Sequence, residues 1–162
     1  MTSKELCNKY PFLSWYGNPL FVGYSEEEAH SQYTWEHELP DGWRKAFCPQ
    51  IWDELKAILE KADYVDKFRF TQIKEKYGTL RLYHIGVPES IYDEVSAWEN
   101  KYEKLSEETC ITCGKSATHM TLGWINFICE ECKNFEQTKV IPIEDAEIYF
   151  NNPEEYFKTH KI

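Results

Sequence analysis

Four cysteines near the C-terminal end of the sequence have the spacing of metal ligands. They form two Cys-x2-Cys pairs, Cys110 with Cys113 and Cys129 with Cys132, with fifteen residues between the pairs. This spacing predicts one tetrahedral zinc site per chain, although two disulfides or unrelated thiols would also fit it. Gly114 follows the first pair, where a metal-binding turn needs a residue that accepts a positive φ. Because four thiolates leave no coordination position for water or substrate, we expect a structural zinc ion and not a catalytic one.

Other residues that could do chemistry lack partners at catalytic spacing. His119 lies between the two pairs with only Asn126 as a companion for a nuclease-like metal, so a surface histidine is the favoured interpretation. Cys48 has no convergent histidine nearby and is expected to pack rather than react. The sequence contains no phosphate-binding glycine loop, Gly-x-Ser-x-Gly elbow or His-Glu-x-x-His helix. It therefore favours a protein that is not an enzyme, with an unrecognised pocket for an enzyme or small-molecule sponge as an alternative.

The composition is that of one ordinary folded domain. The chain has 162 residues, of which 42 % are hydrophobic and 16 % aromatic, which is enough for a core and excludes wholesale disorder. Its first residues are polar and no apolar run reaches membrane length, so we expect a reducing cytoplasm and no membrane contact. The net charge of −10 repels phosphate backbones and favours protein partners.

Three elements precede the cysteines. Residues 49–62 carry apolar side chains on one side of a predicted helix, and residues 89–108 repeat this pattern in a second, acidic helix. Between them the period changes to two, which predicts a β-hairpin that bends at Tyr77 and Gly78. Its inward residues are expected to be Phe68, Phe70, Leu80 and Leu82, with Ile73 on the other face. A further alternation from Tyr33 to His37 predicts a short strand.

These elements predict an α+β fold with three parts. The body (residues 1–108) would hold a small antiparallel hairpin or sheet packed with two amphipathic helices. The cysteine module (residues 109–134) would be a zinc ribbon or a treble-clef-like unit, in which a strand over residues 124–128 leads to Cys129. The tail (residues 135–162) is expected to form one or two short helices packed on the body.

Three surfaces are candidates for contact with a partner. The first is the basic hairpin, whose side chains could bind a nucleic-acid backbone and stack a base: Lys67, Arg69, Lys74, Lys76, Arg81, Tyr77 and Tyr83. The favoured interpretation is that these cations neutralise the acidic helix at residues 89–108. That helix, with Trp98 and Tyr102, and the cysteine module, with Trp124, are the candidate protein-binding faces.

The order of motifs resembles a group of small phage and prophage proteins. These share a Lys-Glu-Lys-aromatic-Gly-Thr-Leu-Arg hairpin, here residues 74–81, and a C-terminal zinc-finger-like cysteine cluster that often has a histidine where Cys132 stands. The resemblance covers residues 9–132 and includes Lys9-Tyr10-Pro11, Asp41-Gly42-Trp43 and Gly123-Trp124. It implies a bacterial cytoplasm and a role against host defence through a host or phage protein partner, and it leaves the oligomeric state open.

Overall fold

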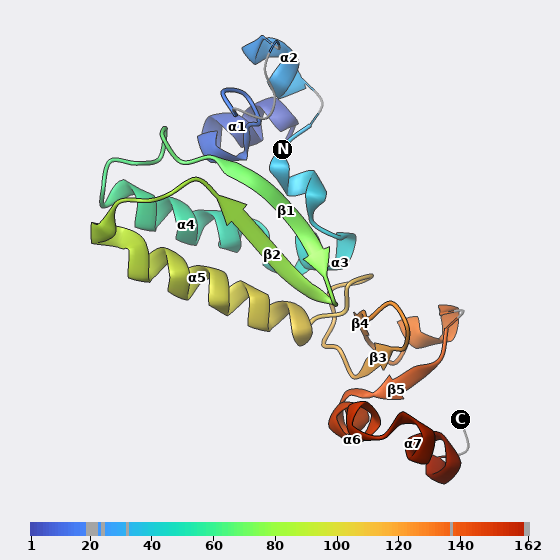
Figure 1. Ribbon diagram of the computed structural model, residues 1–162. Coiled ribbons are helices and arrows are strands. Elements are labelled where there is room, and N and C mark those ends of the chain that lie inside the picture. The colour runs from blue at the N-terminus through green and yellow to red at the C-terminus, as the bar shows by residue number, and fades with distance from the viewer. Residues whose placement is uncertain (19–22, 24, 32, 137, 161–162) are drawn as a thin grey trace.

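The computed structural model describes all residues except 19–22, 24, 32, 137 and 161–162. The described residues form helices and two small antiparallel sheets, so the expected α+β class is confirmed (Figure 1). The N-terminal helices and the C-terminal helices lie at opposite ends of the molecule, with the hairpin between them (Figure 1). No helix in the described ranges is both long and apolar enough to span a bilayer.

The predicted hairpin is present and consists of β1 (Phe70–Lys76) and β2 (Thr79–His84). Its turn lies at Tyr77 and Gly78, whose φ angles are 55° and 79°. Two successive positive φ angles define a type I′ turn, whose twist matches that of the flanking strands. Glycine is therefore required at the second position, and the predicted bend is confirmed.

The inward face of the hairpin differs from the simple alternation. The register shifts between Phe70 and Gln72, where one extra residue forms a bulge in β1. After the bulge, Ile73 faces the core with 1 % of its surface exposed, so its expected outward position is wrong. Phe68, Phe70 and Leu80 are buried as predicted.

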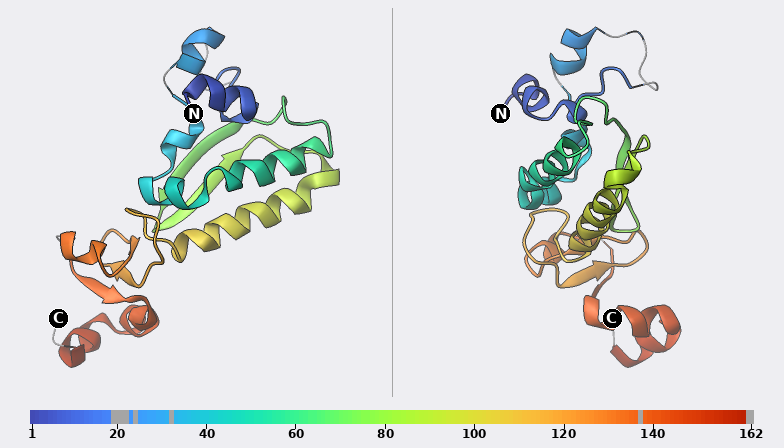
Figure 2. Two further views of the ribbon diagram at one scale, coloured as in Figure 1. Left: turned by 180° about the vertical axis from the view of Figure 1, so that it is seen from behind. Right: turned by 90° about the vertical axis from the view of Figure 1, so that its left-hand side faces the viewer.

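Two helices cover the inner face of this sheet, α4 (Gln50–Glu60) and α5 (Glu89–Glu107). They run side by side along the hairpin (Figure 2). Trp98 and Tyr102 on α5 are 3 % and 2 % exposed, and Trp98 Nε1 donates a hydrogen bond to Ile51 O at 3.0 Å. Both rings belong to the core, so their expected role on a partner-binding face is wrong. Their spacing along α5 follows the period of the helix, which is typical of residues buried on one side of a helix.

Short helices form the N-terminal part of the body. They are α1 (Ser3–Lys9), η1 (Pro11–Leu13), α2 (Glu26–Ser31), η2 (Trp35–Glu38) and α3 (Asp41–Phe47), where η denotes a 3-10 helix. The strand expected from Tyr33 to His37 is wrong, because η2 occupies most of that range. Thr34 begins η2 by accepting a backbone hydrogen bond from His37, 3.0 Å long.

The cysteine module and the tail share a second sheet. Its strands are ordered β4 (Phe127–Ile128), β3 (His119–Thr121) and β5 (Val140–Pro142), and the strand expected over residues 124–128 is reduced to β4. The residues Cys132–Phe135 form η3 between β4 and β5. The helices that follow β5 are η4 (Ile143–Asp145), α6 (Ala146–Asn151) and α7 (Pro153–His160).

The tail packs on the cysteine module and not on the body, which corrects the sequence-based expectation. Tyr156 of α7 is buried in a cluster with Met120, Leu122 and Ile141. Its hydroxyl donates to Asp145 Oδ2 at 2.7 Å, which joins α7 to η4. This second apolar cluster contains no residue of the body.

Candidate metal centre

The four cysteines converge on one point. Their Sγ atoms all lie within 4.8 Å of one another, and the Sγ atoms of Cys113 and Cys129 are 3.5 Å apart. Four sulfurs at bonding distance from a tetrahedral ion would be separated by about 3.8 Å. All six cysteines are free thiols, so the disulfide alternative is wrong. Within the described part of the chain, this is the only group of three or more Cys, His, Asp or Glu side chains close enough to share a metal ion.

A tight turn after α5 presents the first pair. Cys110 N donates to Lys115 O at 2.7 Å, and Gly114 N donates to Cys110 O at 2.9 Å. The φ angle of Gly114 is 84°, so the expected positive φ is confirmed. These bonds define the turn that carries the first pair.

A short hairpin presents the second pair. β3 and β4 pair antiparallel, with His119 opposite Ile128, so the end of β4 brings Cys129 back to the first pair. His119 is not in the thiolate cluster. Its side chain is only 15 % exposed and its Nε2 lies 3.5 Å from Glu130 Oε2, so the expected surface histidine is in fact largely covered.

The first cysteine turn also docks directly on the body. Gly42 N donates to Ile111 O at 2.8 Å, and the indole of Trp43 donates to Thr109 O at 3.4 Å. A Cβ atom at Gly42 would overlap the backbone of Cys110 and Ile111, so only glycine permits this approach. The string Asp41-Gly42-Trp43 was part of the resemblance, but nothing in the sequence indicates this contact.

The environment of the cluster favours a bound cation. Burial raises the pKa of Cys110, but backbone N–H groups at Cys113, Cys129 and Thr112 lower it to about 7, so this thiol ionises readily. Burial and hydrogen bonding with the other three cysteine thiols raise the pKa of Cys132. Four thiolates as close together as these sulfurs would repel one another unless a positive ion lay between them. The site could hold a metal ion.

The hairpin cations are partly neutralised by α5. Arg81 forms an ion pair with Glu103, and His84 Nε2 lies 3.1 Å from Glu99 Oε1. Burial lowers the pKa of His84, but the hydrogen bonds to Glu99 and to the carbonyl of Ile85 raise it above its ordinary value. Of the cations that were expected to neutralise the acidic helix, Arg81 is the one for which the described residues show an ion pair with α5.

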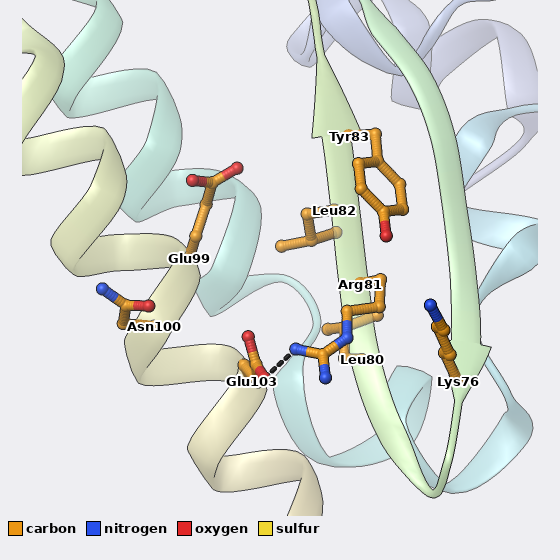
Figure 3. A pocket seen from close by; sticks show the side chains of 8 residues that line it. All are labelled: Lys76, Leu80, Arg81, Leu82, Tyr83, Glu99, Asn100 and Glu103. Atoms are coloured by element: carbon orange, nitrogen blue, oxygen red, sulfur yellow. Dashed lines mark ion pairs between the residues drawn. The ribbon is translucent and has the colours of Figure 1, made fainter.

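A groove of about 410 Å³ lies between β2 and α5 (Figure 3). Arg81 reaches across it to Glu103, and Tyr83, which is 41 % exposed, points outward from β2 (Figure 3). Arg69 does not line this groove; it is half-buried and donates to Phe68 O at 2.7 Å. The predicted hairpin residues are therefore not gathered into one site.

A second hollow, which we name the hairpin-tip groove, separates the hairpin from the cysteine module. It has a volume of about 330 Å³ and is lined by residues 74–77 and 123–125. Tyr77 is 70 % exposed and Trp124 is 72 % exposed. Glu75 holds this region together, since its Oε2 accepts from Trp124 Nε1 at 3.2 Å and its Oε1 accepts from Gly78 N at 2.6 Å.

Trp124 is exposed, and its place on a contact surface stays a prediction. Tyr77 was predicted only as a ring that could stack a base in the nucleic-acid alternative. Its exposure follows from its position in a two-residue turn, where a large side chain has little to pack against.

Comparison with known proteins gave no match. No family model, no curated protein and no solved structure matches the chain. The function is therefore argued from the geometry of the cysteine cluster and the surfaces beside it.

Proposed function

We propose that this chain is a zinc-containing protein without enzymatic activity, which binds another protein and thereby inhibits a component of bacterial defence. The observation that carries the proposal is the pair of exposed rings, Tyr77 and Trp124, which line one groove between the hairpin and the cysteine module. Large rings exposed on a rigid base are typical of protein interfaces. A closed cluster offers no position to a substrate, so it supports binding and not catalysis.

Zinc is the metal that this donor set favours. Four thiolates are soft ligands, which disfavour magnesium and calcium, and two Cys-x2-Cys pairs around one tetrahedral point are typical of structural zinc. The ion would join the turn after α5 to the end of β4. Its role is to fix the cysteine module, and Trp124 with it, against the body.

The phage setting rests on the resemblance of the hairpin string, residues 74–81. The geometry gives this string a physical meaning, which supports its use as a motif. Gly78 is required by the type I′ turn, Leu80 is buried, and Arg81 pairs with α5. Glu75 ties the turn to Trp124. A protein of this kind would act in a bacterial cytoplasm.

Charge favours a protein partner over nucleic acid. The chain carries a net charge of −10, which repels a phosphate backbone. Arg81, which the nucleic-acid alternative requires, already has Glu103 as a partner. The basic groups that remain beside the exposed rings are Lys74 and Lys76, which suit a local acidic segment better than a long polyanion.

The test is affinity capture from bacterial lysate treated with nuclease. We expect the tagged, metal-loaded chain to retain a specific bacterial protein, and the two purified proteins to form a complex of defined stoichiometry. An unrelated acidic protein with the same tag is the control. Recovery of the same proteins by the control, or binding that disappears with nuclease treatment, would rule out the proposal.

A further inference from the structure

We propose that the hairpin-tip groove binds a short, extended, acidic segment of the partner protein along the edge of β1. This inference rests on the proposed function, because it assigns the surface and the chemistry of the partner. The segment would place an apolar side chain against Trp124 and Tyr77 and a carboxylate beside each of Lys74 and Lys76.

The groove follows the edge of the strand and not the face of the sheet. It is lined by Lys74, Glu75 and Lys76, three successive residues of β1, and by no residue of β2. A hollow over the face of the sheet would be lined by residues of both strands. The sheet contains β1 and β2 only, so no described strand pairs with this edge.

The register determines which backbone groups this edge presents. Lys76 and Thr79 flank the two-residue turn and form a hydrogen-bonded pair, as do Lys74 and Arg81. The pair between them, Glu75 and Leu80, directs its N–H and C=O groups away from the hairpin.

The other strand of the hairpin, β2, shows the same alternation. Leu80 N points away from β1 and donates to Ser106 Oγ on α5 at 2.9 Å. By the same alternation, Glu75 N–H and C=O point outward from β1, on the side where the groove lies. They can form one pair of main-chain hydrogen bonds with an extended segment.

The length of the segment is limited on both sides. Asn18 Nδ2 donates to Phe70 O at 2.6 Å at the start of β1, η2 packs against the same strand, and the groove begins only at Lys74. The accessible edge therefore runs from Lys74 to the turn. A segment of about three residues can pair with it.

Charge determines the class of segment. Lys74 and Lys76 form no ion pair within the described residues and lie over the rings of Tyr83 and Tyr77, at 5.4 and 5.5 Å. The carboxylate of Glu75 accepts hydrogen bonds from Gly78 N and Trp124 Nε1, and its single negative charge is outnumbered by the two lysines. Pairing β1 with β1 of a second copy would bring these lysines against one another, which is unfavourable.

Strand geometry then predicts the pattern of the ligand. Side chains alternate between the two faces of a strand. The residue opposite Glu75 shares the face of Glu75 and Trp124, while its two neighbours share the face of Lys74 and Lys76. The recognised pattern is acidic, apolar, acidic.

The experiment selects short peptides from a random displayed library on the purified, metal-loaded chain. We expect enrichment of the acidic–apolar–acidic pattern, and shifts of the Trp124 indole and Glu75 amide signals in NMR spectra. K74E/K76E should weaken the binding of the selected peptides by about 10-fold or more. The matched variant K45E/K104E alters the net charge equally on exposed lysines outside the groove and should change the affinity less than about 2-fold. N-methylation of the peptide amide opposite Glu75 should also weaken binding.

Several outcomes would overturn the assignment. The library could yield peptides without acidic residues, or the peptides could leave the NMR signals of Trp124 and Glu75 unchanged. The two double variants could weaken binding equally, or the chain could dimerise with shifts of these same NMR signals. Stronger binding of a single-stranded thymidine oligonucleotide at Trp124 would assign the groove to nucleic acid instead.

Lysate capture separates this inference from the proposed function. If K74E/K76E still retains the bacterial partner, the surface is wrong and the function stands. If the peptides bind as expected but no bacterial protein is retained, the groove stands and the function is wrong.

Discussion

Replacing Gly42 with alanine is expected to destabilise the chain by about 3 kcal/mol or more. The added Cβ would lie 2.5 Å from the carbonyl carbon and oxygen of Ile111, and closer still to Cys110 O. These are backbone atoms and cannot rotate away. Either α3 or the first cysteine turn must move, which breaks the hydrogen bond from Gly42 N to Ile111 O. The contact between the body and the metal centre would be lost.

Urea denaturation measures this effect, and Gly86→Ala is the matched control. A Cβ at Gly86 meets nothing within 4 Å and its φ is not positive, so we expect a change within about 1 kcal/mol. If the two variants are equally stable, the cysteine turn does not dock on α3 as described. The metal content of Gly42→Ala gives a second readout, because a displaced Cys110 would lower the affinity for the ion.

Loss of the metal is expected to unfold the chain from Cys110 to the end of α7 while the body remains folded. In the described residues, the cysteine module and the tail have a small apolar cluster around Met120, Leu122, Ile141 and Tyr156, and three short strands. A unit of about 50 residues with so small a core needs a metal or another crosslink to fold. Structural zinc contributes roughly 10–16 kcal/mol of apparent binding free energy in small zinc fingers, so its removal is decisive.

Hydrogen exchange of Cys110→Ser and of the chelated wild-type chain tests this expectation. Protection should be lost in β3 and β5 and retained in α4 and α5. Cys48→Ser is the control, because Cys48 lies outside the thiolate cluster and the variant should keep both its metal and its protection. Full protection of β3 in the metal-free chain would refute a structural role for the ion.

Local features were predictable from the sequence. The spacing of the two cysteine pairs predicted the cysteine cluster, and the glycine after the first pair predicted the positive φ of Gly114. Both predictions were possible because a metal-binding turn involves only neighbouring residues. The hairpin bend at Tyr77 and Gly78 was predictable for the same reason, since a two-residue turn is specified by its own residues. The helical periodicity of the apolar residues predicted α4 and α5.

Features that depend on distant segments were not predictable. The bulge after Phe70 reverses the direction of Ile73, and no pattern of period two contains it. Trp98 was assigned to a surface because aromatic residues are enriched at interfaces, although its place in an apolar stripe predicts burial. The apolar side of α7 indicates that Tyr156 packs against another element. It does not indicate that Met120 is the residue it packs against.

The hairpin-tip groove is the clearest case. Tyr77 lies in the turn of the hairpin and Trp124 in the loop between β3 and β4, and both line one groove, where Glu75 links the turn to the indole. A single sequence contains no signal for such a contact. The proposal that a partner binds at this groove, and not at the cysteine cluster, therefore depends on the three-dimensional arrangement.

The central claim is that the four cysteines form a closed, structural zinc site, and X-ray absorption at the zinc edge of the purified chain tests it most directly. The account predicts about one zinc ion per chain, with four sulfur ligands at about 2.3 Å and no nitrogen or oxygen ligand. A spectrum with an oxygen ligand in place of one sulfur would indicate an open, catalytic site. That result, or a cysteine module that stays folded without metal, would rule out a closed structural zinc site.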